Sequence, residues 1–142
     1  MEPIYIREFR YPEDYSQVIG IWEKMEKGIR LGASDAPKEI EKKLLRDPEL
    51  FLVAVFNEEL IGAVIGGFDG RRGYIYHLAV VAMFRGQGIG SRLMEELELR
   101  LRAKGCIRCH LLVTNDNDEV KSFYLNHGWK PLDNTPFAKD LT

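Results

Sequence analysis

Residues 78–91 contain Leu78-Ala79-Val80 and, four residues later, Arg85-Gly86-Gln87-Gly88-Ile89-Gly90-Ser91. The first triplet ends an apolar run typical of a strand, and the residues after Gly90 show the apolar spacing of a helix. Glycines between a strand and a helix let the backbone take up positive φ and approach a ligand closely. The unpaired N–H groups of the first helical turn then face an anion, with the helix dipole in support. The stretch therefore predicts a phosphate-binding turn.

The chain has 142 residues, 45% of them hydrophobic, and a formal net charge of -2. This length suits one domain and the hydrophobic content excludes a disordered chain. The total charge gives no basic signature for nucleic acid, and no run is long or apolar enough to cross a membrane. The charge is nevertheless uneven: residues 71–108 hold eight Arg and Lys against three Asp and Glu. This positive excess surrounds the glycine-rich turn, as a phosphorylated ligand would favour.

Apolar periodicity predicts helices from Pro12 to Met25, after Ser34 or Asp35, from Ile89 to about Lys104, and between Asp116 and Gly128. Strands are expected at Ile4–Ile6, 50–56, 60–68, 74–80 and 107–113, with weaker strand character at 129–132 and 136–141. Glu96–Arg100 and Glu98–Arg102 are favourable pairs, and Asp116 with Glu119 resembles a capping box. The order predicts a mixed sheet covered by helices.

The glycine pattern is not a P-loop, which needs Gly-Lys-Ser/Thr, and it follows several strands, unlike the dinucleotide-binding fingerprint. Instead, Leu78-Ala79-Val80 followed by residues 85–90 resembles the acetyl-CoA motif of the GNAT superfamily of N-acetyltransferases. Asn117, Tyr124 and Gly128-Trp129 match the second pattern of that family in order and spacing. The segment from Leu50 to Trp129 is similar to the small bacterial members of the YpeA type.

The resemblance implies an α+β fold with a mostly antiparallel central sheet, one catalytic domain over residues 1–142, and acetyl-CoA as co-substrate without a metal. Leu78, Ala79 and Val80 would pair with the pantetheine arm after a bulge. The amides from Gly86 to Ser91 would hold the pyrophosphate beside Arg85, and Asn117 would contact the cofactor. Tyr124 would protonate the departing thiolate. The residues at the turn are Arg85, Gly86, Gln87, Gly88, Ile89, Gly90 and Ser91.

The general base is the missing part of this pattern. Relatives place a glutamate or histidine where this chain has Tyr74, Tyr76 or Leu112. Alternation predicts that Tyr74, Tyr76 and Leu78 share one face of their strand, and that Ile75, His77 and Ala79 share the other. His77 is then the nearest titratable candidate, although a single histidine in a strand is more often structural.

Cys106-Ile107-Arg108-Cys109-His110 matches the c-type haem pattern, but an offset of three residues in a strand directs two side chains to opposite faces. We therefore expect neither haem nor a shared metal. The predicted activity is acetyl transfer to a primary amine by direct attack, in the cytoplasm and without nucleic acid or membrane partners. Members of the family that it resembles often form a homodimer, but nothing in this sequence marks the interface. The alternative is a non-catalytic acyl-CoA-binding regulatory module. The acceptor is expected between the first two helices and the loop from Gly28 to Asp35.

Overall fold

The computed structural model describes residues 3–25 and 27–142. Over these residues the elements follow one another as β1 (Tyr5–Glu8), α1 (Tyr15–Glu23), α2 (Pro37–Arg46), β2 (Phe51–Phe56), β3 (Glu59–Phe68), β4 (Gly73–Val80), α3 (Ile89–Ala103), β5 (Cys109–Leu111) and α4 (Asp118–Asn126). Short 3₁₀ turns at Ala33–Asp35, Pro48–Leu50 and Ala82–Phe84 lie between them.

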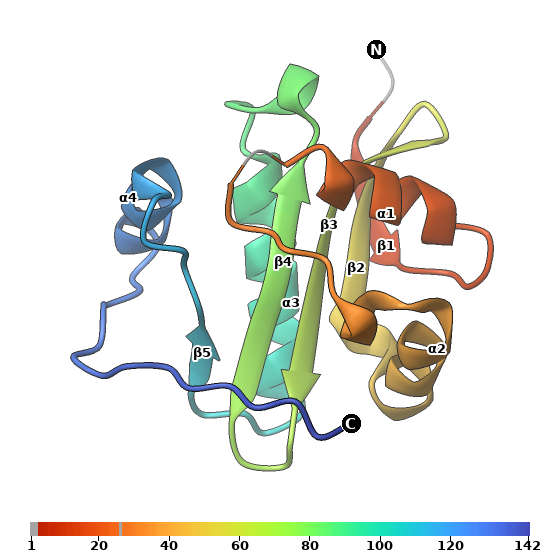
Figure 1. Cartoon of the computed structure of the whole chain (residues 1–142). Coiled ribbons are helices and arrows are strands. Elements are labelled where there is room, and N and C mark those ends of the chain that lie inside the picture. Colours follow the sequence, from red (N-terminus) through yellow and green to blue (C-terminus); the bar gives the residue numbers. More distant parts are fainter. Residues whose placement is uncertain (1–2, 26) are drawn as a thin grey trace.

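The strands form one sheet in the order β1-β2-β3-β4-β5. Neighbouring strands run antiparallel from β1 to β4, and β5 joins β4 in parallel (Figure 1). The sheet is therefore mixed and mostly antiparallel, which confirms the predicted fold class. The parallel pair needs a crossover connection, and α3 supplies it.

Helices cover both faces of the sheet, with α1 and α2 on one face and α3 on the other (Figure 1). Trp22 and Val18 of α1 pack against Phe51 and Val53 on the first face. Leu93 and Leu97 of α3 pack against the opposite face. Because β2 is covered on both sides, its residues are apolar without alternation.

Most of the predicted elements are confirmed within a few residues. Helix α1 begins at Tyr15, because Pro12 to Asp14 form a turn rather than the first helical residues. The two predicted pairs on α3 are present, at 2.9 Å for Arg100 Nε to Glu96 Oε1 and 3.5 Å for Arg102 Nη2 to Glu98 Oε1.

The predicted strands at the C-terminal end are wrong. Residues 129–142, all of which the structure describes, form no strand and are almost entirely exposed. Pro131 and Pro136 lack the N–H that a sheet ladder needs. The strand expected over 107–113 shortens to β5, because Ile107 and Leu112 are 91% and 73% exposed on either side of it.

Candidate active site

A bulge in β4 sets the geometry of the site. Tyr76 pairs with Ile65 of β3, but the next paired residue, Ala79, lies opposite Ala63, so β4 carries one extra residue. His77 has φ +55° at this point, a conformation that residues other than glycine rarely adopt. The bulge re-aims the side chains that follow it.

The expected alternation along β4 is therefore wrong beyond Tyr76. Ile75 packs on the α3 side, whereas Ala79 packs on the α1 side. Leu78 joins the α3 side instead of sharing a face with Tyr74 and Tyr76, whose rings stack 6.2 Å apart. A pattern rule based on period two cannot place side chains across an inserted residue.

The glycine-rich turn ends at the N-terminus of α3, as expected. Gly86 and Gly88 have φ of +77° and +80°, and Gly88 is the residue that precedes the helix. Among the described atoms, nothing lies within 4 Å of where a Cβ would stand at either glycine. Helical hydrogen bonding starts with the Arg92 N–H donating to the Gly88 carbonyl at 3.0 Å. The preceding amides of the first turn are therefore available to an anion.

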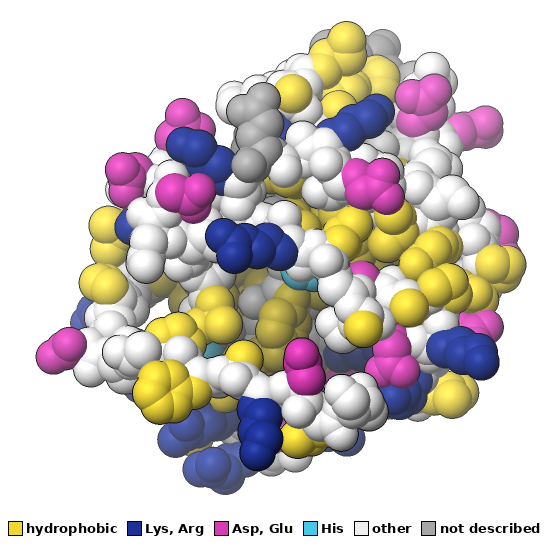
Figure 2. Space-filling view, in the orientation of Figure 1, with side chains coloured by type: hydrophobic (Ala, Val, Ile, Leu, Met, Phe, Trp, Pro, Cys, Tyr) yellow, Lys and Arg dark blue, Asp and Glu magenta, His cyan; other side chains and the backbone are white. Residues whose placement is uncertain are grey.

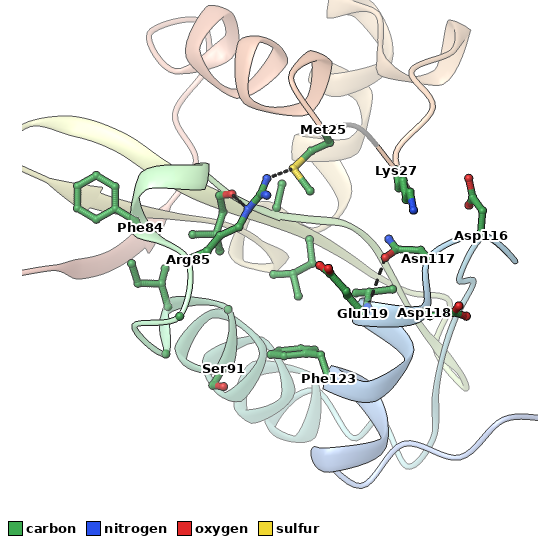
Figure 3. A pocket seen from close by; sticks show the side chains of 18 residues that line it. Met25, Lys27, Phe84, Arg85, Ser91, Asp116, Asn117, Asp118, Glu119 and Phe123 are labelled. Carbon is green, nitrogen blue, oxygen red and sulfur yellow. Dashed lines mark hydrogen bonds between the residues drawn. The ribbon is translucent and has the colours of Figure 1, made fainter.

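A cavity of about 810 Å³ lies between this turn, β4 and the start of α4 (Figure 3). It is large enough for an extended cofactor. Figure 2 shows this side of the molecule hollowed, with hydrophobic side chains at the floor. Ten of the residues predicted to bind the cofactor line it: Leu78, Ala79, Val80, Arg85, Gly86, Gly88, Ile89, Gly90, Ser91 and Asn117. Gln87 is exposed and is not among the described residues that line the cavity.

Arg85 bends across the cavity toward α1 (Figure 3). Its Nε donates to the Val80 carbonyl at 3.1 Å, and its Nη2 lies 3.4 Å from the Met25 sulfur. These contacts hold the guanidinium between the end of β4 and the loop after α1. The positive charge predicted beside the glycine turn is therefore positioned by both walls of the cavity.

Asn117, rather than Asp116, caps α4. Its side-chain oxygen accepts a hydrogen bond from the Val120 N–H at 3.3 Å, so the predicted capping box at Asp116 and Glu119 is wrong by one residue. A Cβ at Gly28 would stand 2.7 Å from Asn117 Nδ2, so the loop after α1 packs closely on this amide. Asn117 thus joins α4 to the loop at Gly28.

Sequence reasoning missed several residues that line the cavity: Met25, Lys27, Phe84, Asp116, Asp118, Glu119, Val120 and Phe123. Glu119 extends from the start of α4 toward the middle of the cavity in Figure 3. The helix spacing of Val120 and Phe123 marked them as one apolar face, but nothing in the sequence distinguished a cavity wall from the core. Contacts between distant segments decide such placements.

Tyr124 lines a second, smaller cavity of about 70 Å³ and not the larger one. The two cavities adjoin, because Leu78, Asn117 and Val120 contribute to both. The Tyr124 ring packs against those of Phe123 and Trp129, with centroids 5.3 and 5.9 Å away. Burial raises the pKa of Tyr124 to about 12, so the phenol keeps its proton at physiological pH.

His77 borders the same small cavity and has a partner that the sequence did not reveal. Its Nε2 lies 3.1 Å from Oδ1 of Asp35, a buried carboxylate in the loop before α2. The ring also meets the edge of Trp22, with centroids 4.8 Å apart. Asp35 was expected only as a cap or loop residue; 42 positions separate it from His77, so no local pattern connects them.

The expectation that the two thiols point apart is wrong. Cys106 and Cys109 place their sulfur atoms 3.8 Å from each other. Gly105 has φ +92° and Cys106 lies in the turn before β5, so the strand rule does not apply to it. Burial, followed by the hydrogen bond with Cys106, raises the pKa of Cys109 to about 12, which keeps this thiol protonated and poorly reactive.

Neither a metal cluster nor a membrane helix is found in the part of the chain that the structure describes. Over residues 3–25 and 27–142, no three His, Cys, Asp or Glu side chains gather as metal ligands. No helix in these residues combines the length and apolar character of a membrane span.

Comparison with known proteins identifies the family to which this chain is similar. The acetyltransferase (GNAT) family model matches residues 13–129. An acetyltransferase from Pectobacterium atrosepticum is 42% identical over 136 residues, which cover 96% of this chain and 94% of that protein. An acetyltransferase from Sodalis glossinidius is 43% identical over 119 residues, covering 84% of this chain and 82% of that protein.

Solved structures agree with the sequence relatives. Ard1 from Thermoplasma volcanium superposes with a TM-score of 0.76 at 28% identity, covering 88% of this chain and 81% of that one. PaiA N-acetyltransferase from Thermoplasma acidophilum, in complex with coenzyme A, shares the fold with a TM-score of 0.80 at 23% identity, over 94% of this chain and 93% of that one. The chain belongs to the GNAT family of acetyl-CoA-dependent N-acetyltransferases.

Proposed function

We propose that residues 1–142 act as a single domain that transfers the acetyl group of acetyl-CoA to a primary amine by direct attack within a ternary complex. The observation that carries the proposal is the pair of adjoining cavities. The larger one meets the amide end of α3, and the smaller one is lined by Tyr124 together with residues 75–78 of β4. A long anionic co-substrate and a small reacting group would fit these two spaces.

Each residue then has a separate task in binding. The amides that follow Gly86 and Gly88 would hold the pyrophosphate, and Arg85, held by Val80 and Met25, would add positive charge beside them. The backbone of Leu78, Ala79 and Val80 would pair with the pantetheine arm. Glycine suits the turn because positive φ is required there and because the space beside it is open.

The chemistry requires a neutral amine, a polarised carbonyl and a proton for the departing sulfur. The amine nitrogen forms a bond to the thioester carbon while a strand amide near Val80 stabilises the oxyanion. The C–S bond then breaks, and Tyr124 gives its proton to the thiolate. The proton on the new amide nitrogen restores Tyr124. A phenol that stays protonated up to a pKa of about 12 is a donor at every working pH.

The acceptor side is formed by the loop from Gly28 to Asp35, which borders the small cavity through Gly28 and Ile29. Acceptors of several kinds meet the requirement of a primary amine: a protein N-terminus, a lysine, a polyamine or an amino sugar. We also propose a cytoplasmic location, where thiols such as Cys106 and Cys109 stay reduced.

The test is thiol release from acetyl-CoA in the presence of a panel with one amine of each kind, with CoA affinity measured by calorimetry. We expect turnover with one class and tight CoA binding. Tight CoA binding without turnover on any amine would instead support the non-catalytic acyl-CoA-binding module. Absence of CoA binding would contradict both.

A further inference from the structure

His77 and Asp35 form an ordered pair at the acceptor side of the smaller cavity. The Asp35 carboxylate accepts from the Gly32 N–H through Oδ2 at 3.0 Å, and its Oδ1 faces His77 Nε2 at 3.1 Å. The Tyr15 hydroxyl donates to the Asp35 carbonyl at 2.8 Å. Backbone and side chain of Asp35 are therefore both fixed, and the whole residue is only 8% exposed.

The histidine is held from its other sides as well. Trp22 Nε1 donates to the His77 carbonyl at 2.8 Å, and the Trp22 ring meets the imidazole at 63° between planes. The backbone of His77 has φ +55°, which costs free energy in any residue that carries a Cβ. Contacts from α1, from β4 and from the loop before α2 thus hold this ring in one position.

The pairing decides which ring nitrogen carries the proton. A carboxylate only accepts hydrogen bonds, so the neutral imidazole must place its N–H at Nε2. Nδ1 is then left with a lone pair, which is the form a proton acceptor needs. The same logic orients histidines in hydrolase triads, where a carboxylate fixes the tautomer.

His77 also borders the cavity where the acceptor amine is expected. His77 lines the small cavity together with Tyr76 and Tyr124. Gly28 and Ile29 of the acceptor-side loop line it too. The residues at the usual base positions, Tyr74, Tyr76 and Leu112, cannot replace a carboxylate or imidazole at neutral pH.

We propose that His77 is the general base that deprotonates the acceptor, and that Asp35 is the positioning residue that places the proton of the neutral imidazole on Nε2. The inference rests on the proposed function. An acceptor ammonium transfers one proton to Nδ1 and becomes the neutral amine that attacks the thioester. His77 then returns this proton to solvent, and the other exchanged proton passes between the new amide nitrogen and Tyr124.

Four further titratable groups lie around the ring or its partner. Lys27 and Tyr124 line the same cavity as His77, Tyr76 precedes it on β4, and Tyr15 binds the backbone of its partner. Burial raises the pKa of Tyr15, Tyr76 and Tyr124, so these phenols stay neutral in ordinary assays. Lys27 and Asp35 are then the charged neighbours of the ring. An imidazole that already carries protons on both nitrogens cannot accept one from the acceptor, so activity should be lost at acid pH.

Two nearly isosteric variants separate catalysis from structure. In His77→Gln the amide nitrogen can still donate to Asp35, but no base remains. In Asp35→Asn the amide can still accept from Gly32, while its NH₂ faces His77 Nε2 and moves the imidazole proton to Nδ1. We expect each variant to lower kcat near pH 7 by about 100-fold, with CoA affinity within about twofold of wild type.

The assay uses acetyl-CoA and the amine of highest turnover from the panel, from pH 6 to pH 10. The defect should shrink as pH approaches the pKa of the amine itself, because solvent then supplies the neutral form. His110→Gln, on β5 and outside both cavity linings, is the matched control and should keep wild-type kcat.

Wild-type kcat in His77→Gln, or a defect in thermal stability alone, would overturn the role of His77. A kcat loss in His77→Gln that Asp35→Asn does not share would overturn the tautomer argument. A wild-type chain that binds CoA and turns over no amine would refute the proposed function, and this inference with it. A chain with turnover and unaffected variants would refute the inference alone.

Discussion

The sulfur atoms of Cys106 and Cys109 lie 3.8 Å apart, directly against Gly73 at the start of β4. A Cβ at Gly73 would stand 2.9 Å from one sulfur and 3.0 Å from the other. The glycine therefore serves close packing rather than a special backbone conformation. The contact joins β4 to the turn that precedes β5, at the point where Gly73 pairs with Cys109.

Gly73→Ala should lower the free energy of unfolding by about 1–3 kcal/mol, because the added methyl must displace two sulfur atoms from a packed region. Urea unfolding measures this cost. Combining Gly73→Ala with Cys106→Ala should recover part of the lost free energy of unfolding. Gly67→Ala on the adjacent strand is the control, since its Cβ would meet only the flexible end of Lys43 at 3.4 Å. Equal costs for both alanines would contradict the packing argument.

Gly88→Glu should abolish measurable acetyl-CoA binding. A carboxylate at this position would occupy the space beside the first-turn amides of α3 and repel the pyrophosphate. Part of any effect comes from backbone strain, about 1–2 kcal/mol for a left-handed residue with a Cβ.

Gly70→Glu controls for that strain, because Gly70 has φ +100° in the turn between β3 and β4, away from the cavity. Calorimetry on both folded variants should show wild-type affinity for Gly70→Glu and a loss of at least about 100-fold for Gly88→Glu. Similar affinities would remove the glycine turn from the binding site.

The central elements could be predicted because their signals are local. Helix α3 follows from its apolar spacing, and β2 from an uninterrupted apolar run between turns. The prediction of C-terminal strands rests only on short apolar stretches. Phe137 and Leu141 are 94% and 90% exposed, so these residues gain no burial that would stabilise a strand.

Only the part of the candidate site that a single segment forms could be predicted from the sequence. The turn from Arg85 to Ser91 places glycines with positive φ directly before α3, and the motif was sufficient to predict this geometry. The β4 bulge depends on register with β3, and the contact between His77 and Asp35 depends on the path of the loop before α2. Such long-range geometry leaves no periodic trace in the sequence.

Asp14→Asn should destabilise the fold at pH 7 by about 2–4 kcal/mol, since it removes one partner of a largely buried, charge-assisted contact. Arg7 donates to both Asp14 oxygens, at 2.6 and 3.0 Å, and the Arg10 N–H donates at 2.8 Å. Burial by itself would raise the pKa of Asp14, but these hydrogen bonds lower it below its usual value of 3.8.

The sign of the pH dependence follows from this direction. The unfolded chain binds a proton at Asp14 before the folded chain does, so the contribution is complete above about pH 4 and is lost as pH falls through the folded pKa. Urea unfolding at pH 7 and pH 3 should therefore show a smaller acid loss for Asp14→Asn than for wild type. Glu13→Gln, at the adjacent exposed acid, should match wild type both in stability at pH 7 and in the stability lost at pH 3.

Tyr124→Phe should lower kcat by about 100-fold and leave CoA affinity within about threefold, because it removes only the hydroxyl that we propose as proton donor to the thiolate. The ring remains to pack against Trp129 and Phe123. Thiol release and calorimetry measure the two quantities separately. Tyr5→Phe on β1, at an exposed tyrosine, is the control and should change neither. An unchanged kcat in Tyr124→Phe would reduce this residue to a packing role.

Tyr124→Phe also allows a test of folding stability that needs no amine acceptor. Burial raises the folded pKa of Tyr124 from 10.0 to about 12, so between these values the unfolded chain releases a proton that the folded chain retains. Stability should then fall as pH rises above about 10, by at most about 1.4 kcal/mol per pH unit from this group. Cys109, raised from 9.0 to about 12, adds a slope of the same sign in both proteins. The wild type should therefore lose more stability than Tyr124→Phe between pH 9 and pH 11.5, and parallel losses would show that the phenol is hydrated in the folded state.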